Sequence, residues 1–146
     1  MLSAEELEQR IRDGIPITAQ MAFRVRDLSA NSITVVGGGA ENLNVHGTAF
    51  AGSLYAISTL ALWGLVHANL PENAALVLAD GSIRYHQPVV GDIVARCEIP
   101  AVKMNDFLTR LRERGRAILD ATVQVPGAAG IAAEYQGTVH ARLGHE

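Results

Sequence analysis

The stretch from Asn42 to Pro71 contains no Asp, Glu, Lys or Arg, yet it holds several side chains that could do chemistry. His46 could take a proton from water, because an unperturbed imidazole titrates near pH ~6.5. Asn44 could hold that water or polarise a carbonyl group. Each residue also has a structural alternative: the histidine could stabilise the loop, and asparagine is common in turns, where its side chain bonds the backbone.

Five hydroxyl side chains follow in the same stretch. Ser53 and Ser58 could act as nucleophiles only beside a base, and their simpler roles are a hydrogen bond at a helix start and a satisfied hydroxyl in a buried helix. Thr48 is predicted to cap the helix, since threonine is favoured at helix starts. Thr59 could orient a water molecule, and Tyr55 could bring its hydroxyl to the same place or pack in the core.

The element that carries these residues is predicted to be a long helix. Thr48 to Val66 is an uncharged run of 19 residues, close to the ~20 needed to cross a bilayer. Small and polar residues dilute its hydrophobicity, the Lys/Arg flanks that orient a membrane span are missing, and the pattern of a soluble sheet follows. We therefore expect a helix buried on nearly all sides and no membrane insertion.

Strands are indicated by apolar residues at every second position, which places them on one face of a sheet. The pattern predicts a first hairpin around a turn that contains Asn31, two strands with a turn at Pro88 to Gly91, and a last hairpin that turns at Pro126 to Gly130. The residues expected on the apolar faces are Met21, Phe23, Val25, Ile33, Val35, Ile83, Tyr85, Ile93, Ala95, Cys97, Ile99, Leu119, Ala121, Val123, Val125, Ile131, Ala133, Tyr135, Gly137, Val139, Ala141 and Leu143.

Two shorter helical segments complete the expected elements. Ser3 and Glu6 have the spacing of a capping box before a helix at about residues 4 to 13. A helical turn is expected near Asn105 to Arg112. Antiparallel strands packed against one buried helix form an α+β arrangement in which the sheet wraps the helix on one side.

The composition bounds the class of protein. With 146 residues, of which 49% are hydrophobic and 18% charged, the chain fits one folded domain over 1–146. The net charge of -3 removes the electrostatic attraction on which nucleic-acid binders rely, so no nucleic-acid partner is expected. The one cysteine, Cys97, excludes an intrachain disulfide or a multi-Cys metal site, and fits a buried thiol in a reducing cytosol. The first residues lack the features of a secretory signal, so we expect a cytoplasmic protein without metal or other cofactor.

The run NVHGTAFAGSLYAISTLALWGL, from Asn44 to Leu65, resembles the loop and central helix of hotdog-fold acyl thioesterases. The later run IRYHQPVVGDIVARCEI matches that fold's aromatic-x-x-Pro turn, followed by Gly-Asp and a second strand. The similarity extends from about Phe23 to Leu143, and it is closest to a thioesterase family whose domain also occurs as the C-terminal part of acetyltransferase-fused proteins. The resemblance implies a hotdog fold, in which a curved antiparallel sheet is wrapped around one long central helix.

The same resemblance implies a homodimer, or a dimer of dimers, with the acyl site at the subunit interface and an acyl-CoA or acyl-carrier protein as substrate. Thioester hydrolysis needs hydrogen-bond donors aimed at the carbonyl oxygen as it gains charge. A helix start supplies them through its free amides and its dipole. Ala51, Gly52 and Ser53, near the predicted helix start, are the candidate donors. The substrate-binding residues expected around them are Gly47, Thr48, Phe50, Ala51 and Tyr55.

The catalytic carboxylate of the fold is missing from this chain. Many hotdog thioesterases carry His-Gly-Gly, followed nine residues after the histidine by an Asp or Glu on the helix. Here that alignment places residues 50–52 over the His-Gly-Gly and Thr59 over the carboxylate. The candidate substitutes are His46 as base and Asn44 as its companion in the preceding loop.

Two other functions stay open. Glu41 precedes His46 by the spacing of a hydratase dyad, in which an acid and a histidine activate water for addition to a double bond. A pocket without a base would instead serve as an acyl-chain or acyl-CoA binding module.

Charged residues elsewhere have less specific expectations. Asp80 and Asp92 are expected at turns. A group of basic residues could meet CoA phosphates or the acidic helix of a carrier protein, or could form a solvated face. The group consists of Lys103, Arg110, Arg112, Arg114 and Arg116.

Overall fold

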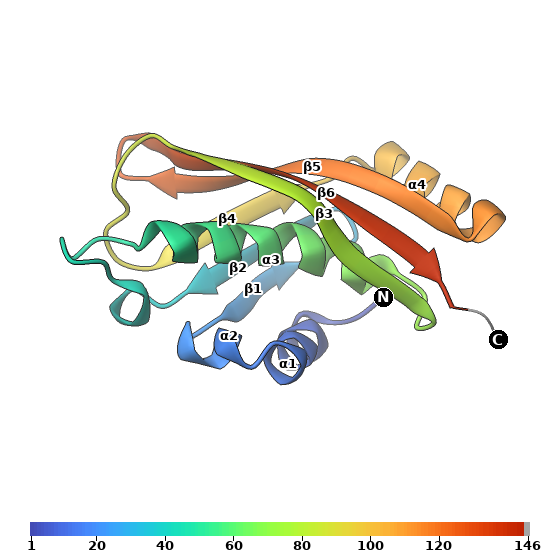
Figure 1. Ribbon diagram of the computed structural model, residues 1–146, viewed down its shortest axis with the longest axis horizontal. Coiled ribbons are helices and arrows are strands. Elements are labelled where there is room, and N and C mark those ends of the chain that lie inside the picture. Colours follow the sequence, from blue (N-terminus) through green and yellow to red (C-terminus); the bar gives the residue numbers. More distant parts are fainter. Residues whose placement is uncertain (145–146) are drawn as a thin grey trace.

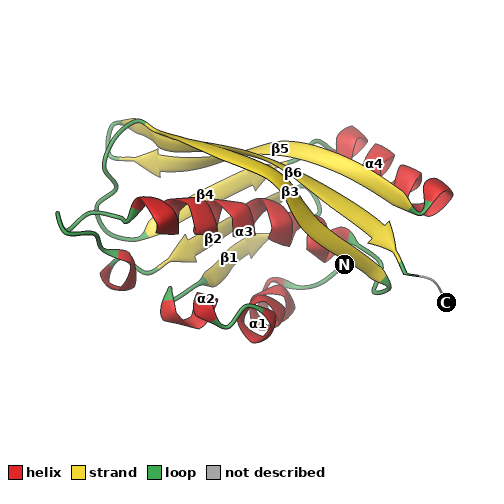
Figure 2. Ribbon diagram, in the orientation of Figure 1, coloured by secondary structure: helices red, strands yellow, loops and turns green. Residues whose placement is uncertain are grey.

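A six-stranded antiparallel sheet curves around one long helix in the computed structural model, which describes residues 1–144 (Figure 1). The helix, α3, spans Ala51–Asn69 and lies along the concave side of the sheet (Figure 2). This is the hotdog fold that the resemblance implied. The strands are β1 (Arg24–Leu28), β2 (Ser32–Gly37), β3 (Ala74–Tyr85), β4 (Ile93–Glu98), β5 (Arg116–Gly127) and β6 (Gly130–Leu143), and their order across the sheet is β1-β2-β4-β5-β6-β3.

Two predicted hairpins are confirmed, and one predicted connection is of another kind. β1 pairs with β2, and β5 pairs with β6 along almost its whole length. The turn at Pro88 to Gly91 does not join neighbouring strands: β3 lies at the sheet edge beside β6, whereas β4 lies between β2 and β5. Alternation shows which face of a strand is buried, but it does not say which strand lies beside it.

The long helix is buried because it is apolar on all sides rather than along one stripe. Ile57, Leu62 and Leu65 have no exposed surface. By length and composition α3 could cross a membrane, but 61% of its most apolar window is buried inside the protein. The prediction of a buried core helix is therefore confirmed.

The other helices lie at the ends of this core. α1 (Ala4–Gly14) begins with the predicted capping box, in which the Ser3 hydroxyl accepts the Glu6 amide and the Glu6 carboxylate accepts the Ser3 amide. α2 (Ile17–Gln20) and the 3-10 helix η1 (Ala40–Asn42) are short connectors.

α4 spans Ala101–Arg114 and is longer than the predicted helical turn. Met104, Phe107 and Leu111 recur at helical spacing, and all three are buried. The helix lies beside the first half of β5, where β4 no longer pairs with that strand (Figure 1).

Asp80 and Gly81 lie within β3, so the turn predicted there is wrong. The pairing register with β6 shifts between Leu78 and Asp80, which marks a bulge. Bulges and turns favour similar residues, because both interrupt a regular ladder. Asp92 does follow a turn: Gly91 has φ +83°, and the Asp92 carboxylate accepts the Gly39 amide at 2.8 Å.

Candidate active site

The loop before α3 is built on the side chain of Asn44. Its Nδ2 donates to the Thr48 hydroxyl at 2.9 Å and to the Ala49 carbonyl at 3.2 Å. Its Oδ1 accepts the amides of His46 at 2.8 Å and Thr48 at 3.2 Å. Because an asparagine side chain has two donor hydrogens and one carbonyl oxygen with two lone pairs, its bonding capacity is filled inside the loop.

Two anchors tie this loop to the rest of the protein. The buried side chain of Asn42 donates to the carbonyls of Met21 at 2.9 Å and Gly38 at 2.7 Å, and the backbone carbonyl of Asn42 accepts the Phe50 amide. The amide of Ala49 donates to the Val89 carbonyl at 2.9 Å, on the segment between β3 and β4. The loop therefore enters the helix in a fixed direction.

The helix start carries no side-chain cap. The N-cap residue is Phe50, and no side chain within residues 1–144 accepts a hydrogen bond from the first turn. The predictions that Thr48 caps the helix and that Ser53 bonds at its start are therefore wrong: the Thr48 hydroxyl is held by Asn44 inside the loop. The first amide with a partner in the helix is that of Leu54, which donates to the Phe50 carbonyl. The amides of residues 51–53 precede it, as at any helix start.

A tyrosine from the edge strand fixes the first turn from the other side. The Tyr85 hydroxyl donates to the Ala51 carbonyl at 2.8 Å. Burial raises the pKa of Tyr85, with a smaller contribution from nearby Tyr55. The hydroxyl thus stays protonated and able to donate at neutral pH.

Two turns further along α3, Thr59 lies in a cluster of hydroxyl groups. Its Oγ1 donates to the Tyr135 hydroxyl at 3.0 Å. Tyr135 is fully buried and packs edge-on against Tyr55, with ring centroids 5.3 Å apart. Burial is the main cause that raises the pKa of Tyr135, against an opposing effect of the Thr59 bond. Thr59 and Tyr55 therefore lie in one cluster with Tyr135.

Glycine in β3 makes room for these hydroxyl groups. A Cβ on Gly81 would collide with the Tyr55 hydroxyl and lie 2.7 Å from that of Tyr135. Its cross-strand neighbour is Gly137, where a Cβ would lie 2.8 Å from Leu62 on α3. The two glycines allow the sheet to approach the helix closely.

The remaining candidates lie around the helix start. His46, Gly47 and Phe50 are exposed, and Gly47 has a left-handed φ of +76°. The Phe50 ring covers Gly52, since a Cβ there would lie close to the ring. The structure thus separates two groups: residues 44–53 at the start of α3, and Thr59 with its tyrosines along the helix.

Glu41, the candidate acid of a hydratase dyad, has no side-chain bond to His46. The carboxylate of Glu41 lies over Gly38, where a Cβ would collide with it. The His46 side chain makes no hydrogen bond or ion pair with residues 1–144. The acid and the histidine are therefore not joined.

Two further predictions concern side chains inside the core. Burial raises the pKa of Cys97 to about 12, so the thiol stays protonated, as expected for a structural cysteine. Ser58 was expected to be satisfied, but its buried hydroxyl has no hydrogen-bond partner within residues 1–144. Its neighbours one turn away on α3, Leu54 and Leu62, carry no side-chain acceptor.

Tyr85, Gly81 and Tyr135 are the site residues that the sequence did not single out. Tyr135 and Tyr85 fit the apolar alternation of their strands, which gives no sign of the hydroxyl contacts. A polar hydroxyl on an apolar strand face is the one signal that could have found them, because a buried tyrosine usually bonds a partner.

A curved antiparallel sheet around one long central helix is the arrangement of the hotdog-fold thioesterases, a class of thioester hydrolases. The chain matches the family described as "Putative thioesterase (yiiD_Cterm)" over residues 4–142. It belongs to that family.

Solved structures from several bacteria share the fold. A putative thioesterase from Shewanella oneidensis is 28% identical, with a TM-score of 0.81 and 97% coverage of both chains. A protein of Pseudomonas aeruginosa described as a probable thioesterase is 21% identical, with a TM-score of 0.85, covering 98% of this chain and 97% of the other. A protein of unknown function from Chlorobaculum tepidum is 22% identical, with a TM-score of 0.90, covering 97% of this chain and 94% of the other.

Proposed function

We propose that the protein is a cytoplasmic enzyme that hydrolyses acyl-CoA or acyl-carrier-protein thioesters at the start of α3. The observation that carries this proposal is the uncapped first turn, whose amides at Ala51, Gly52 and Ser53 have no side-chain cap within residues 1–144. Free amides and the positive end of the helix dipole favour an oxygen that gains negative charge. The thioester carbonyl oxygen gains such a charge when water attacks its carbon.

His46 is the proposed base. In its neutral form the imidazole takes a proton from water as the oxygen bonds to the carbonyl carbon. The C–S bond then breaks, and the imidazolium returns the proton to the leaving thiolate. A carboxylic acid and a free thiol are the products. The exposed, unbonded side chain of His46 is available for this role.

Asn44 acts as a positioning residue in this proposal. Its four hydrogen bonds hold residues 46, 48 and 49, which leaves no hydrogen on the amide to polarise a thioester carbonyl. Gly47, Thr48 and Phe50 belong to the same loop and face the substrate. Asn44 thus aligns the base with the helix amides.

Thr59 orients a second bound water molecule two turns along α3, on the acyl-chain side of the site. Because its hydrogen is donated to Tyr135, its oxygen lone pairs remain free to accept from a water molecule. Tyr55 closes the same side through its contact with Tyr135.

The site is completed by a second copy of the chain in this proposal. β3 has β6 as its one strand partner within residues 1–144, so its other edge is open to pairing. Apolar side chains in the loop before α3 and in the segment between β3 and β4 are exposed, among them Leu43, Val45, Phe50 and Val90. Such a surface is typical of a protein interface.

The test is release of free thiol from acyl-CoAs of short, long and aromatic acyl groups. Asn44→Ala and His46→Ala should both lose turnover while remaining folded. Asn73→Ala and His86→Ala are matched controls, because both residues are exposed and neither side chain bonds within residues 1–144. Unchanged turnover in His46→Ala would remove the base assignment. Tight acyl-CoA binding without thiol release would identify a binding module, and hydration of an enoyl-CoA without CoA release would identify a hydratase.

A further inference from the structure

A basic groove lies between α4 and the face of the sheet turned away from α3. Its volume is about 900 Å³, and its basic residues come from three elements. Arg110 and Arg114 lie one turn apart on α4, Arg116 lies on β5, and His140 and Arg142 lie on β6. The lining residues within 1–144 include no Asp or Glu. The groove is therefore positive in a chain whose net charge is -3.

The β5–β6 register places two positive charges side by side, which is unfavourable without a bound anion. Arg116 and Arg142 are direct cross-strand partners in the β5–β6 pair. Like charges at such positions destabilise a sheet. An anion between the two guanidinium groups would reverse the sign of the interaction.

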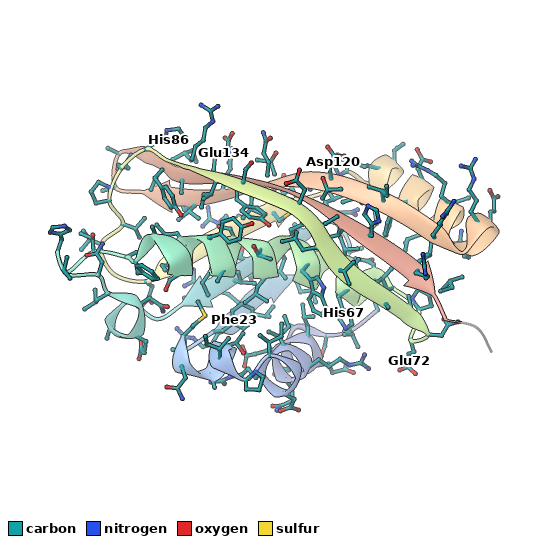
Figure 3. The ribbon with its side chains drawn as sticks, viewed as in Figure 1. Phe23, His67, Glu72, His86, Asp120 and Glu134 are labelled. Atoms are coloured by element: carbon teal, nitrogen blue, oxygen red, sulfur yellow. The ribbon has the colours of Figure 1, made fainter. Side chains whose placement is uncertain are left out.

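Within residues 1–144, no carboxylate forms an ion pair with these arginines. The two ion pairs found in residues 1–144 join Arg10 to Glu72 and Lys103 to Asp120. Asp120, the acid labelled in Figure 3, follows Ile118 on the same strand face and pairs with Lys103. Within residues 1–144, the donors of the groove arginines are therefore not taken up by carboxylates.

The floor of the groove is apolar and open. Val77 is 60% exposed and Ile118 is 52% exposed, and both line it. They flank His140 in one cross-strand row, whereas Ala75 and Arg116 flank Arg142 in the next. The apolar floor lies beside the guanidinium groups of β5, β6 and α4. This combination fits a ligand with a flat apolar part and phosphate groups, because arginine binds phosphate through two parallel N–H donors and stacks on flat rings. The volume of this open groove falls within the range of small-molecule sites.

We propose that this groove binds the adenosine bisphosphate end of a coenzyme A thioester. The proposal rests on the proposed function, which supplies the thioester. The other ligand considered for these basic residues, the acidic helix of a carrier protein, fits less well. A groove of this size favours a small ligand over a broad protein surface.

The location of the groove is consistent with a site shared between two subunits. The groove is at the Ala74 end of β3, whereas the start of α3 is held by Tyr85 at the other end. If two β3 strands pair antiparallel about a two-fold axis, the Ala74 end of one lies beside the Tyr85 end of the other. The groove of one subunit then lies at the same end of the joined sheet as the α3 start of its partner, on the opposite face.

The test is calorimetric titration of the full chain with adenosine 3′,5′-bisphosphate. Arg116→Gln and Arg142→Gln should each weaken binding by about tenfold or more, as for a lost hydrogen bond to a charged group. Arg112→Gln is the matched control. Arg112 lies on α4 but outside the groove, and its side chain donates to Thr109. The melting temperature of Arg142→Gln without ligand should not fall, since the substitution removes a like-charge pair.

Kinetics separate this proposal from the proposed function. Arg142→Gln should raise KM more for an acyl-CoA than for the same acyl group on N-acetylcysteamine, which has no nucleotide. Absence of thiol release together with arginine-dependent bisphosphate binding would overturn the proposed function and support the groove. Thiol release without bisphosphate binding would overturn the groove alone. Equally tight binding of inorganic phosphate, or binding of an acyl-carrier protein in place of the bisphosphate, would also overturn it.

Discussion

Single residues in this protein take their roles from what their hydrogen bonds leave free. The side chain of Asn44 makes all four of its hydrogen bonds inside the loop. The side chain of His46, two residues later, makes no hydrogen bond within residues 1–144. Thr59 donates to Tyr135 and keeps its lone pairs. The roles proposed for them, positioning for Asn44 and Thr59 and base for His46, rest on this difference.

His67 gives the stability of the fold a dependence on pH. It is half-buried near the end of α3 (Figure 3). Its ring stacks on that of Trp63, with centroids 4.5 Å apart. Burial lowers the pKa of His67 below its ordinary 6.5, with a smaller effect from the charge of Arg10. The folded state therefore binds its proton less well than the unfolded state.

Stability should consequently be full above pH 6.5 and should decline as the pH falls through that value toward the lowered pKa of His67. Urea unfolding at pH 5 to 8 measures the decline, and His67→Gln should make it shallower. An unchanged pH profile in His67→Gln would contradict this assignment.

The elements depend on glycines that let α3 and the sheet meet. Gly81 in β3 faces the hydroxyl groups of Tyr55 and Tyr135. Gly81→Ala should reduce the free energy of unfolding by about 1–3 kcal/mol, the usual cost of overpacking. It should also lower turnover, since it displaces the cluster around Thr59.

Denaturant unfolding measures this prediction, with Gly14→Ala as the control. A Cβ on Gly14 would contact nothing within 4 Å, so that variant should be as stable as the wild type or slightly more stable. Equal stability of Gly81→Ala and wild type would show that the sheet can yield there.

Helices and strands were predicted from the sequence more successfully than which of them lie side by side. The alternation of the last two strands and the charge-free run of α3 reflect burial, which is a local property of the chain. The edge position of β3 depends on its pairing with the distant strand β6, and the Thr59–Tyr135 contact joins residues 76 positions apart, so no local pattern exists for either. The helix boundary was misplaced because Thr48 is a common cap in sequence but bonds Asn44 in the structure.

The whole molecule is proposed to work as a dimer. Val45 is 95% exposed at the tip of the loop, so a charge there costs a lone subunit nothing but would be buried in the interface. Val45→Asp should weaken the dimer at least about tenfold. Val102→Asp, at a valine that is 72% exposed on α4, should leave it unchanged.

Sedimentation measures the association of both variants. The wild-type protein should sediment at twice 15.5 kDa. A monomer at concentrations where thiol release is measured would contradict a site shared between two subunits.

The central claim is that the first-turn amides of α3 hold the oxyanion, and removal of one amide tests it most directly. Ala51→Pro deletes the amide hydrogen at the first helical position, where proline is tolerated. The preceding residue, Phe50, already has φ -65° and ψ 132°, which proline requires of its neighbour. Ala51→Gly retains the amide and serves as the control.

The measurement is kcat for thiol release from the best acyl-CoA in both folded variants. The proposed site predicts a loss of about 10²–10³ in kcat for Ala51→Pro, as for other lost oxyanion donors, with the melting temperature unchanged. Wild-type turnover in Ala51→Pro would contradict the claim.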